Sequence, residues 1–190
     1  MKWYKYDIRN LTDSEYNKWF SLMSDENKQK VDRSRILEDK KRTVVGEMLA
    51  KKAISEWCDI PNESIVFETR EHGKPYAKDL KIEFNISHSG NMVVCAVDDK
   101  PIGIDIEQIR PIDLKLAKRF CTKQELTYLF DGADNKEILT RFFKLWTAKE
   151  AHCKCLGKGL ASINTPCSKE TQTFVIEDEY IVSIVVTTSG

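Results

Sequence analysis

The stretch FNISHSGNMVVCAVDDKPIGIDIEQI, residues 84–109, decides the fold of this chain. Apolar runs rich in β-branched residues alternate here with Ser-Gly-Asn and Asp-Asp-Lys, sequences that are typical of turns between strands. The pattern predicts a meander of three strands over residues 81–87, 92–98 and 101–109. A β-sheet is therefore expected at the centre of the chain, and the flanking segments must cover it.

Helical patterns lie on both sides of these strands. Residues 36–57 and 136–156 carry apolar side chains at steps of three and four residues, which is the period of an amphipathic helix. Further elements are expected as helices over residues 12–23 and 114–130, and as strands over residues 1–10, 65–69, 173–176 and 181–187. Because helices precede strands twice, the sequence predicts an α+β fold of two similar lobes.

The composition excludes several classes of protein. The 190 residues include 30 Lys or Arg, 30 Asp or Glu and 41% apolar residues, which suits a soluble domain without a membrane span. A formal net charge of zero provides no overall basic field for nucleic acid. Residues 1–10, MKWYKYDIRN, lack the apolar segment of a secretory signal, so a cytoplasmic location is expected. The six cysteines lack the spacing of a zinc site and are expected to be reduced.

Two carboxylates lie on one face of the strand over residues 101–109. Strand side chains alternate, so Asp105 and Glu107 share a face while the intervening isoleucines point the other way. This arrangement is either a solvated acidic face or a pair of oxygen ligands for Mg²⁺. Gly103 lies on the carboxylate face, where it is expected to leave room for a substrate.

A third carboxylate, Glu150, falls on the apolar stripe of the second long helix. A carboxylate in that position must be paired, bind a cation or lie at the rim of a cleft. One interpretation is an ion pair within the helix, with Lys149 or Lys154 as the partner. The alternative is that Glu150 converges with the two strand carboxylates on a divalent cation, which would place Lys154 beside reacting phosphates.

The sequence Ser87-His-Ser89 ends an apolar strand in a polar turn. Neighbouring strand residues point to opposite faces and no Gly-x-Ser-x-Gly elbow is present, so a serine nucleophile is disfavoured. An anion-binding turn with His88 beside a phosphate, and a plain structural turn, both fit.

Basic residues also gather over 28–42, and Lys74 lies in a Gly-Lys-Pro turn; most are expected to be solvated, and one or two could bind a phosphate.

Three motifs occur in a fixed order that resembles the phosphopantetheinyl transferases of the Sfp type, enzymes that activate nonribosomal peptide and polyketide synthetases. They are FNISHSG at 84–90, PIGIDIE at 101–107 and WTAKEAHCKCLGKGL at 146–160. Weaker matches extend the resemblance over nearly the whole chain: HGKP at 72–75, KRTVVG at 41–46 and KRFCTKQE at 118–125.

The resemblance implies a reaction and an architecture. The reaction is transfer of the 4'-phosphopantetheine group of coenzyme A, with Mg²⁺, to a serine of an apo acyl or peptidyl carrier protein, with release of 3',5'-ADP. The architecture is a monomer of two pseudo-symmetric lobes, residues 1–100 and 101–190, with coenzyme A in the cleft between them. Relative to the family, the second lobe is expected to be shortened after residue 160.

The resemblance also assigns roles to individual residues. The family's metal ligands match Asp105, Glu107 and Glu150. Its catalytic pair matches Glu150, which would accept the serine proton, and Lys154, which would stabilise the departing 3',5'-ADP. The residues that match its coenzyme A contacts are Lys30, Arg42, Thr43, Lys74, Ser87, His88 and Lys154. Lys30 and Lys74 are expected near the 3'-phosphate, and Asn27 stands where the family often has a second basic residue.

The acidic carrier is expected to dock near the basic residues Lys115, Lys118 and Arg119.

Two other functions fit parts of the pattern. A Mg²⁺-dependent phosphodiesterase or nuclease would also use clustered carboxylates, but the neutral net charge argues against it. A coenzyme-A-binding or carrier-binding module without catalysis is the other, and the presence of all three acids and Lys154 argues against it.

Overall fold

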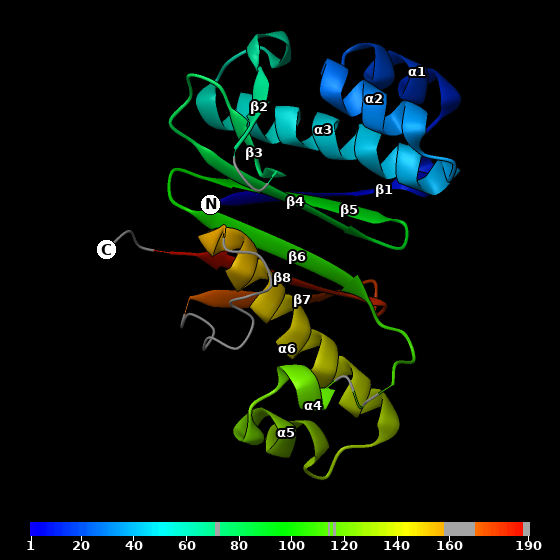
Figure 1. The fold of residues 1–190 in the computed structure, drawn as a ribbon, viewed down its shortest axis with the longest axis vertical. Helices are drawn as coiled ribbons and strands as arrows, with labels where there is room; N and C mark the ends of the chain where they lie inside the picture. The colour runs from blue at the N-terminus through cyan, green and yellow to red at the C-terminus, as the bar shows by residue number, and fades with distance from the viewer. Residues whose placement is uncertain (71–72, 114, 116, 158–169, 188–190) are drawn as a thin grey trace.

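Two three-stranded antiparallel sheets form the centre of the protein (Figure 1). This computed structural model describes residues 1–70, 73–113, 115, 117–157 and 170–187. The first sheet has the order β1-β5-β4, with β1 at Lys2–Asp7, β4 at Glu83–Ser89 and β5 at Met92–Asp98. The second has the order β6-β8-β7, with β6 at Ile102–Gln108, β7 at Thr171–Ile176 and β8 at Tyr180–Val186.

One long helix covers each sheet. Helix α3 (Leu37–Cys58) packs on the first sheet and helix α6 (Asn135–Leu156) packs on the second. The shorter elements are α1 (Asp13–Ser21), α2 (Asp25–Arg33), α4 (Ala117–Phe120), α5 (Lys123–Phe130), the hairpin of β2 (Phe67–Thr69) and β3 (Pro75–Ala77), and 3-10 turns at Ile8–Asn10 and Asn62–Ser64. None of the helices in the described part of the chain is long and apolar enough to cross a membrane.

The core has four layers, in the order helix, sheet, sheet, helix (Figure 1). Alternate residues of β5 explain the middle layers. Val93, Cys95 and Val97 face the α3 side, whereas the residues between them pack against the isoleucines of β6 and against β8. Both faces of β5 are therefore buried, as its continuous apolar sequence requires. The α+β fold class expected from the sequence is confirmed.

The predicted three-stranded meander is wrong at its third strand. Strand β6 does not join the first sheet but pairs with β8, with Ile104 opposite Ile184. The reason is that β5 already has β1 on one edge and β4 on the other, so it has no free edge for β6. The chain crosses to the second sheet over residues 99–101.

The other differences from the predicted elements have local causes. The helix expected over 114–130 is two helices, because Thr122 caps α5 in a capping box with Glu125. The sequence analysis missed helix α2. This helix begins after Ser24, whose hydroxyl accepts a hydrogen bond from the backbone N–H of Asn27. Some positions singled out from the sequence lie outside the described residues: His72, Leu114, residues 158–160 and Cys167.

Gly103 allows helix α6 to approach β6 closely. A Cβ atom at this position would lie 2.0 Å from the carbonyl oxygen of Ala151 and 2.5 Å from the backbone nitrogen of Cys155. The helix backbone therefore occupies the space above Gly103, and the expectation that this glycine leaves room for a substrate is wrong. Its absent side chain instead brings the carboxylates of β6 close to α6.

Candidate active site

Alternate side chains of β4 accept hydrogen bonds from alternate backbone N–H groups of β6. The bonds join Ile104 N to Asn85 Oδ1 (3.0 Å), Ile106 N to Ser87 Oγ (3.4 Å) and Gln108 N to Ser89 Oγ (3.1 Å). Because β6 is an edge strand of its sheet, these N–H groups face away from β8 and need other partners. We call this row of bonds the β4–β6 seam, and it joins the two halves of the chain.

The seam also holds the two strand carboxylates. The Ser87 hydroxyl donates to Asp105 Oδ1 at 2.9 Å, and the Ser89 hydroxyl donates to Glu107 Oε2 at 2.8 Å. Each serine thus accepts a bond from the backbone of β6 and donates one to a carboxylate of β6. The motifs FNISHSG and PIGIDIE therefore contact each other along the seam.

Lys154 reaches the seam from helix α6. Its Nζ lies 2.7 Å from Asp105 Oδ1 and 2.8 Å from Ser87 Oγ. Asp105 is buried, and its other oxygen, Oδ2, has no hydrogen-bond partner among the described residues. Burial raises the pKa of Asp105, and the positive charge of Lys154 opposes that increase. A buried carboxylate oxygen without a donor is a suitable ligand atom for a hard cation.

Glu150 lies one turn before Lys154 and is half-buried. Burial raises its pKa, the negative charges of Asp105 and Glu107 raise it further, and Lys154 acts in the opposite direction. Lys154 pairs with Asp105 at 2.7 Å, and Lys149 pairs with Glu125 at 3.0 Å. These pairings argue against the ion pair within the helix.

The three carboxylates fit a divalent cation in their chemistry. All three are hard oxygen ligands, and the buried Oδ2 of Asp105 has no hydrogen-bond partner within the described part of the chain. Their side chains do not enclose a common point: over the described parts of the chain, no group of three His, Cys, Asp or Glu residues is arranged to hold a metal ion. The assignment of Asp105, Glu107 and Glu150 as metal ligands therefore remains a prediction.

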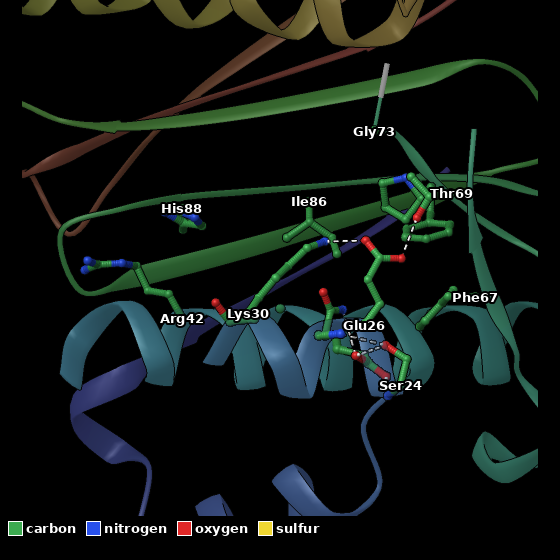
Figure 2. Close-up of a pocket in the computed structure, with 15 residues that line it drawn as sticks. Ser24, Glu26, Lys30, Arg42, Phe67, Thr69, Gly73, Ile86 and His88 are labelled. Carbon is green, nitrogen blue, oxygen red and sulfur yellow. Dashed lines mark hydrogen bonds and ion pairs between the residues drawn. The ribbon is translucent and has the colours of Figure 1, made fainter. Parts of the chain in front are cut away.

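A cavity of about 200 Å³ lies on the α3 side of β4 (Figure 2). It is bounded by α2, α3, β4 and the β2–β3 hairpin. Four of the residues matched to coenzyme A contacts line it: Lys30, Arg42, Thr43 and His88. Lys74 lies between the lining residues Gly73 and Pro75. Ser87 is not part of its wall, because its hydroxyl belongs to the seam.

The polar side chains of this cavity are held by partners in the protein. Arg42 Nη1 donates to the carbonyl oxygen of Gly90 at 2.6 Å, and its Nη2 pairs with Asp39. The Thr43 hydroxyl donates to the backbone oxygen of Asp39 at 2.9 Å. Burial, together with the charges of Arg42 and Lys154, lowers the pKa of His88 below its usual value, so this imidazole is mainly neutral at pH 7.

Glu47 is a buried residue of the cavity wall that the sequence analysis missed. Its carboxylate is buried on α3 and accepts hydrogen bonds from Ser24 N at 2.7 Å and from Asn27 Nδ2 at 2.8 Å. Lys51 Nζ lies 3.4 Å from Glu47 Oε1, and its positive charge balances the carboxylate. Glu47 therefore fixes the start of α2 against α3, and Asn27 serves this contact. The position of this acidic residue on the buried side of a predicted long helix was the signal in the sequence that it needs a partner.

Comparison with known proteins gives the same family for both halves. Residues 10–100 match the model "4'-phosphopantetheinyl transferase, N-terminal", and residues 101–182 match the model "4'-phosphopantetheinyl transferase superfamily". The chain therefore belongs to the 4'-phosphopantetheinyl transferase superfamily, as its motifs suggested.

Curated relatives carry the same description. The chain is 42% identical to the 4'-phosphopantetheinyl transferase Sfp of Bacillus subtilis, over 82% of this chain and 70% of that protein. It is 42% identical to Gsp of Aneurinibacillus migulanus, over 76% of this chain and 60% of that protein. It is 44% identical to Psf-1 of Bacillus pumilus, over 74% of this chain and 60% of that protein. The chain thus spans 60 to 70% of the length of these relatives.

Replacement of Ser87 by alanine is expected to destabilise the protein by about 1–3 kcal/mol. The change removes a donor to the buried Asp105 and an acceptor for Ile106 N. Urea unfolding followed by circular dichroism measures the loss. The matched control is Ser64→Ala, which removes one exposed hydrogen bond and should cost less than about 0.5 kcal/mol. Equal losses in the two variants would contradict the role of the seam.

Proposed function

We propose that this protein transfers the 4'-phosphopantetheine group of coenzyme A to a serine of an apo acyl or peptidyl carrier protein. The observation that carries the proposal is the junction of the two halves. There the seam serines hold Asp105 and Glu107, Lys154 contacts Asp105, and Glu150 lies near enough for the two carboxylates to raise its pKa. The printed names of the relatives, 4'-phosphopantetheinyl transferases, support the same activity.

A divalent cation, Mg²⁺ in the proposal, would be held by Asp105, Glu107 and Glu150. When bound, it would neutralise the charge that develops on the pyrophosphate oxygens during transfer. Residues of this chain would position the ligands of the cation. The seam serines hold the two strand carboxylates, and the close approach at Gly103 brings α6 to them.

Coenzyme A would extend from the cavity beside α3 to the seam. Lys30 and Lys74 would contact the 3'-phosphate, and Arg42, Thr43 and His88 would line the path toward the pyrophosphate. His88 points from β4 on the cavity side, while its neighbour Ser87 points into the seam. Adjacent residues of β4 therefore face the cavity and the carboxylates, on opposite sides of the strand.

In the proposed reaction, the hydroxyl of the carrier serine attacks the β-phosphorus of coenzyme A. A bond forms between the serine oxygen and phosphorus, and the bond from this phosphorus to the bridging oxygen of the pyrophosphate breaks, which releases 3',5'-ADP. Glu150, directly or through a water, would accept the serine proton. Lys154 would stabilise the negative charge on the departing 3',5'-ADP.

The variants Glu150→Ala and Lys154→Ala are expected to lower kcat/KM for transfer by at least about 100-fold, because each loses a group that acts in the transition state. Intact-mass spectrometry of an apo carrier protein, incubated with enzyme, coenzyme A and Mg²⁺, measures the transfer. A parallel sample with chelator should show none. The control variants Glu63→Ala and Lys18→Ala change exposed residues and should match the wild type.

The same assay separates the alternatives. Turnover like that of the wild type in either active-site variant would contradict the assigned role. Coenzyme A binding without any mass gain on several carrier types would indicate a binding module. Release of 3',5'-ADP without a carrier would indicate a phosphodiesterase.

We propose that the carrier docks on the basic surface of α4. Lys115, Lys118 and Arg119 are exposed there. The ammonium group of Lys149, next to Glu150, donates to the carbonyl oxygen of Phe120 at 2.9 Å, which ties α4 to the catalytic helix. A docked acidic partner would therefore lie beside Glu150. The predicted monomeric state and cytoplasmic location remain predictions from the sequence.

Reversal of two charges, Lys118→Glu with Arg119→Glu, is expected to raise KM for the carrier by about tenfold and to leave KM for coenzyme A unchanged, because rim charges act mainly on association. Steady-state kinetics with each substrate varied in turn measure both constants. Lys18→Glu is the control, since α1 lies at the opposite end of the molecule from α4 (Figure 1). An unchanged KM for the carrier would place the docking surface elsewhere.

A further inference from the structure

The carboxylate of Glu26 lies within the cavity, between two groups that could bind a phosphate (Figure 2). Its Oε1 is 2.8 Å from Lys30 Nζ, and the hydroxyl of Thr69 donates to its Oε2 at 2.8 Å. Glu26 and Lys30 belong to α2, whereas Thr69 ends β2 on the other side of the cavity. Both oxygens of the carboxylate are therefore used, and it bridges the opening.

Glu26 differs from the other acidic residues near the cavity. Asp39 and Glu83 pair with Arg42 and Lys74, but neither is among the described residues that line the cavity. Glu47 does line it, but this carboxylate is buried and holds the start of α2. Glu26 is thus the acid whose charge occupies space that a ligand would need.

We propose that Glu26 is a specificity-determining residue that competes with the 3'-phosphate of coenzyme A for Lys30 and Thr69. The inference rests on the proposed function, because it takes coenzyme A as the ligand of this cavity. The protein carries its own anion in the phosphate position. The ligand must displace this anion before it can bind.

The exposure of the pair allows such a displacement. The side chains of Lys30 and Glu26 are 56% and 55% exposed, so water screens their attraction and the carboxylate can rotate into solvent. A phosphate monoester carries a charge of about −1.5 to −2 at pH 7 and three acceptor oxygens. It therefore replaces a single carboxylate on the same donors. The competition lowers the affinity for phosphorylated ligands without preventing their binding.

The variant Glu26→Gln removes the competing charge but keeps the shape of the side chain. The dissociation constant for coenzyme A is expected to fall by about three- to tenfold, because the phosphate no longer displaces or faces a carboxylate. The constant for dephospho-coenzyme A, which lacks the 3'-phosphate, should change by less than about twofold. Isothermal titration calorimetry of the full chain with each ligand measures both constants.

Asp25→Asn is the matched control. Asp25 is the neighbouring residue in the first turn of α2, its side chain is 98% exposed, and it does not line the cavity. Its removal changes the net charge of the protein by the same amount, so the affinity for both ligands should stay within about twofold of the wild type.

Four results would overturn the inference. Affinity for coenzyme A that is unchanged or weaker in Glu26→Gln would mean that Glu26 only links α2 to β2. An equal gain for both ligands, or an equal gain in Asp25→Asn, would indicate a general effect of charge. If the wild-type protein still transfers phosphopantetheine in these cases, only the inference about Glu26 fails and the proposed function stands. Failure of the wild type to bind coenzyme A would overturn both.

Discussion

The open edge of strand β6 is the constraint on which the rest of the structure depends. Its N–H groups at Ile104, Ile106 and Gln108 have side chains of β4 as partners instead of another strand. A pleated strand offers such groups at every second residue, and a facing strand offers side chains with the same period. The match holds two separate sheets together, and it leaves the two seam serines with a proton to donate to Asp105 and Glu107.

The seam and the close approach of α6 together arrange the side chains around Asp105. Without a side chain at Gly103, the helix comes near enough for Lys154 to reach Asp105 and Ser87. The result is a group of carboxylates with one lysine on one side of β4. The cavity with Lys30, Arg42 and His88 lies on the other side. One strand thus serves both the phosphate-binding side and the carboxylate side of the proposed site.

The sequence predicted those features that depend on local periodicity. The bounds of β5 and α6 follow from apolar spacing, and the shared face of Asp105 and Glu107 follows from strand alternation. Features that depend on distant pairing could not be predicted. The placement of β6 in the second sheet depends on β1, which lies about a hundred residues earlier and occupies the free edge of β5.

The same distinction applies to the site. The role of Ser87 in the seam depends on which strand lies beside β4, which its own neighbours do not reveal. Glu26 and Glu47 are acidic residues in ordinary helical sequences, and only the packing of α2 on α3 places them at the cavity. Residue type and motif therefore indicated the chemistry of the carboxylates, whereas the balance of charges in the cavity required the tertiary structure.

The most direct test of the account is whether the carboxylates at the seam bind a divalent cation. Electron paramagnetic resonance of Mn²⁺, titrated into the protein in the presence of coenzyme A, counts bound ions. A single ion per chain is expected, with affinity reduced by at least about tenfold in each of Asp105→Asn, Glu107→Gln and Glu150→Gln, and unchanged in the exposed control Glu63→Gln. Equal binding by the wild type and all three variants would contradict it, as would the absence of binding by the wild type.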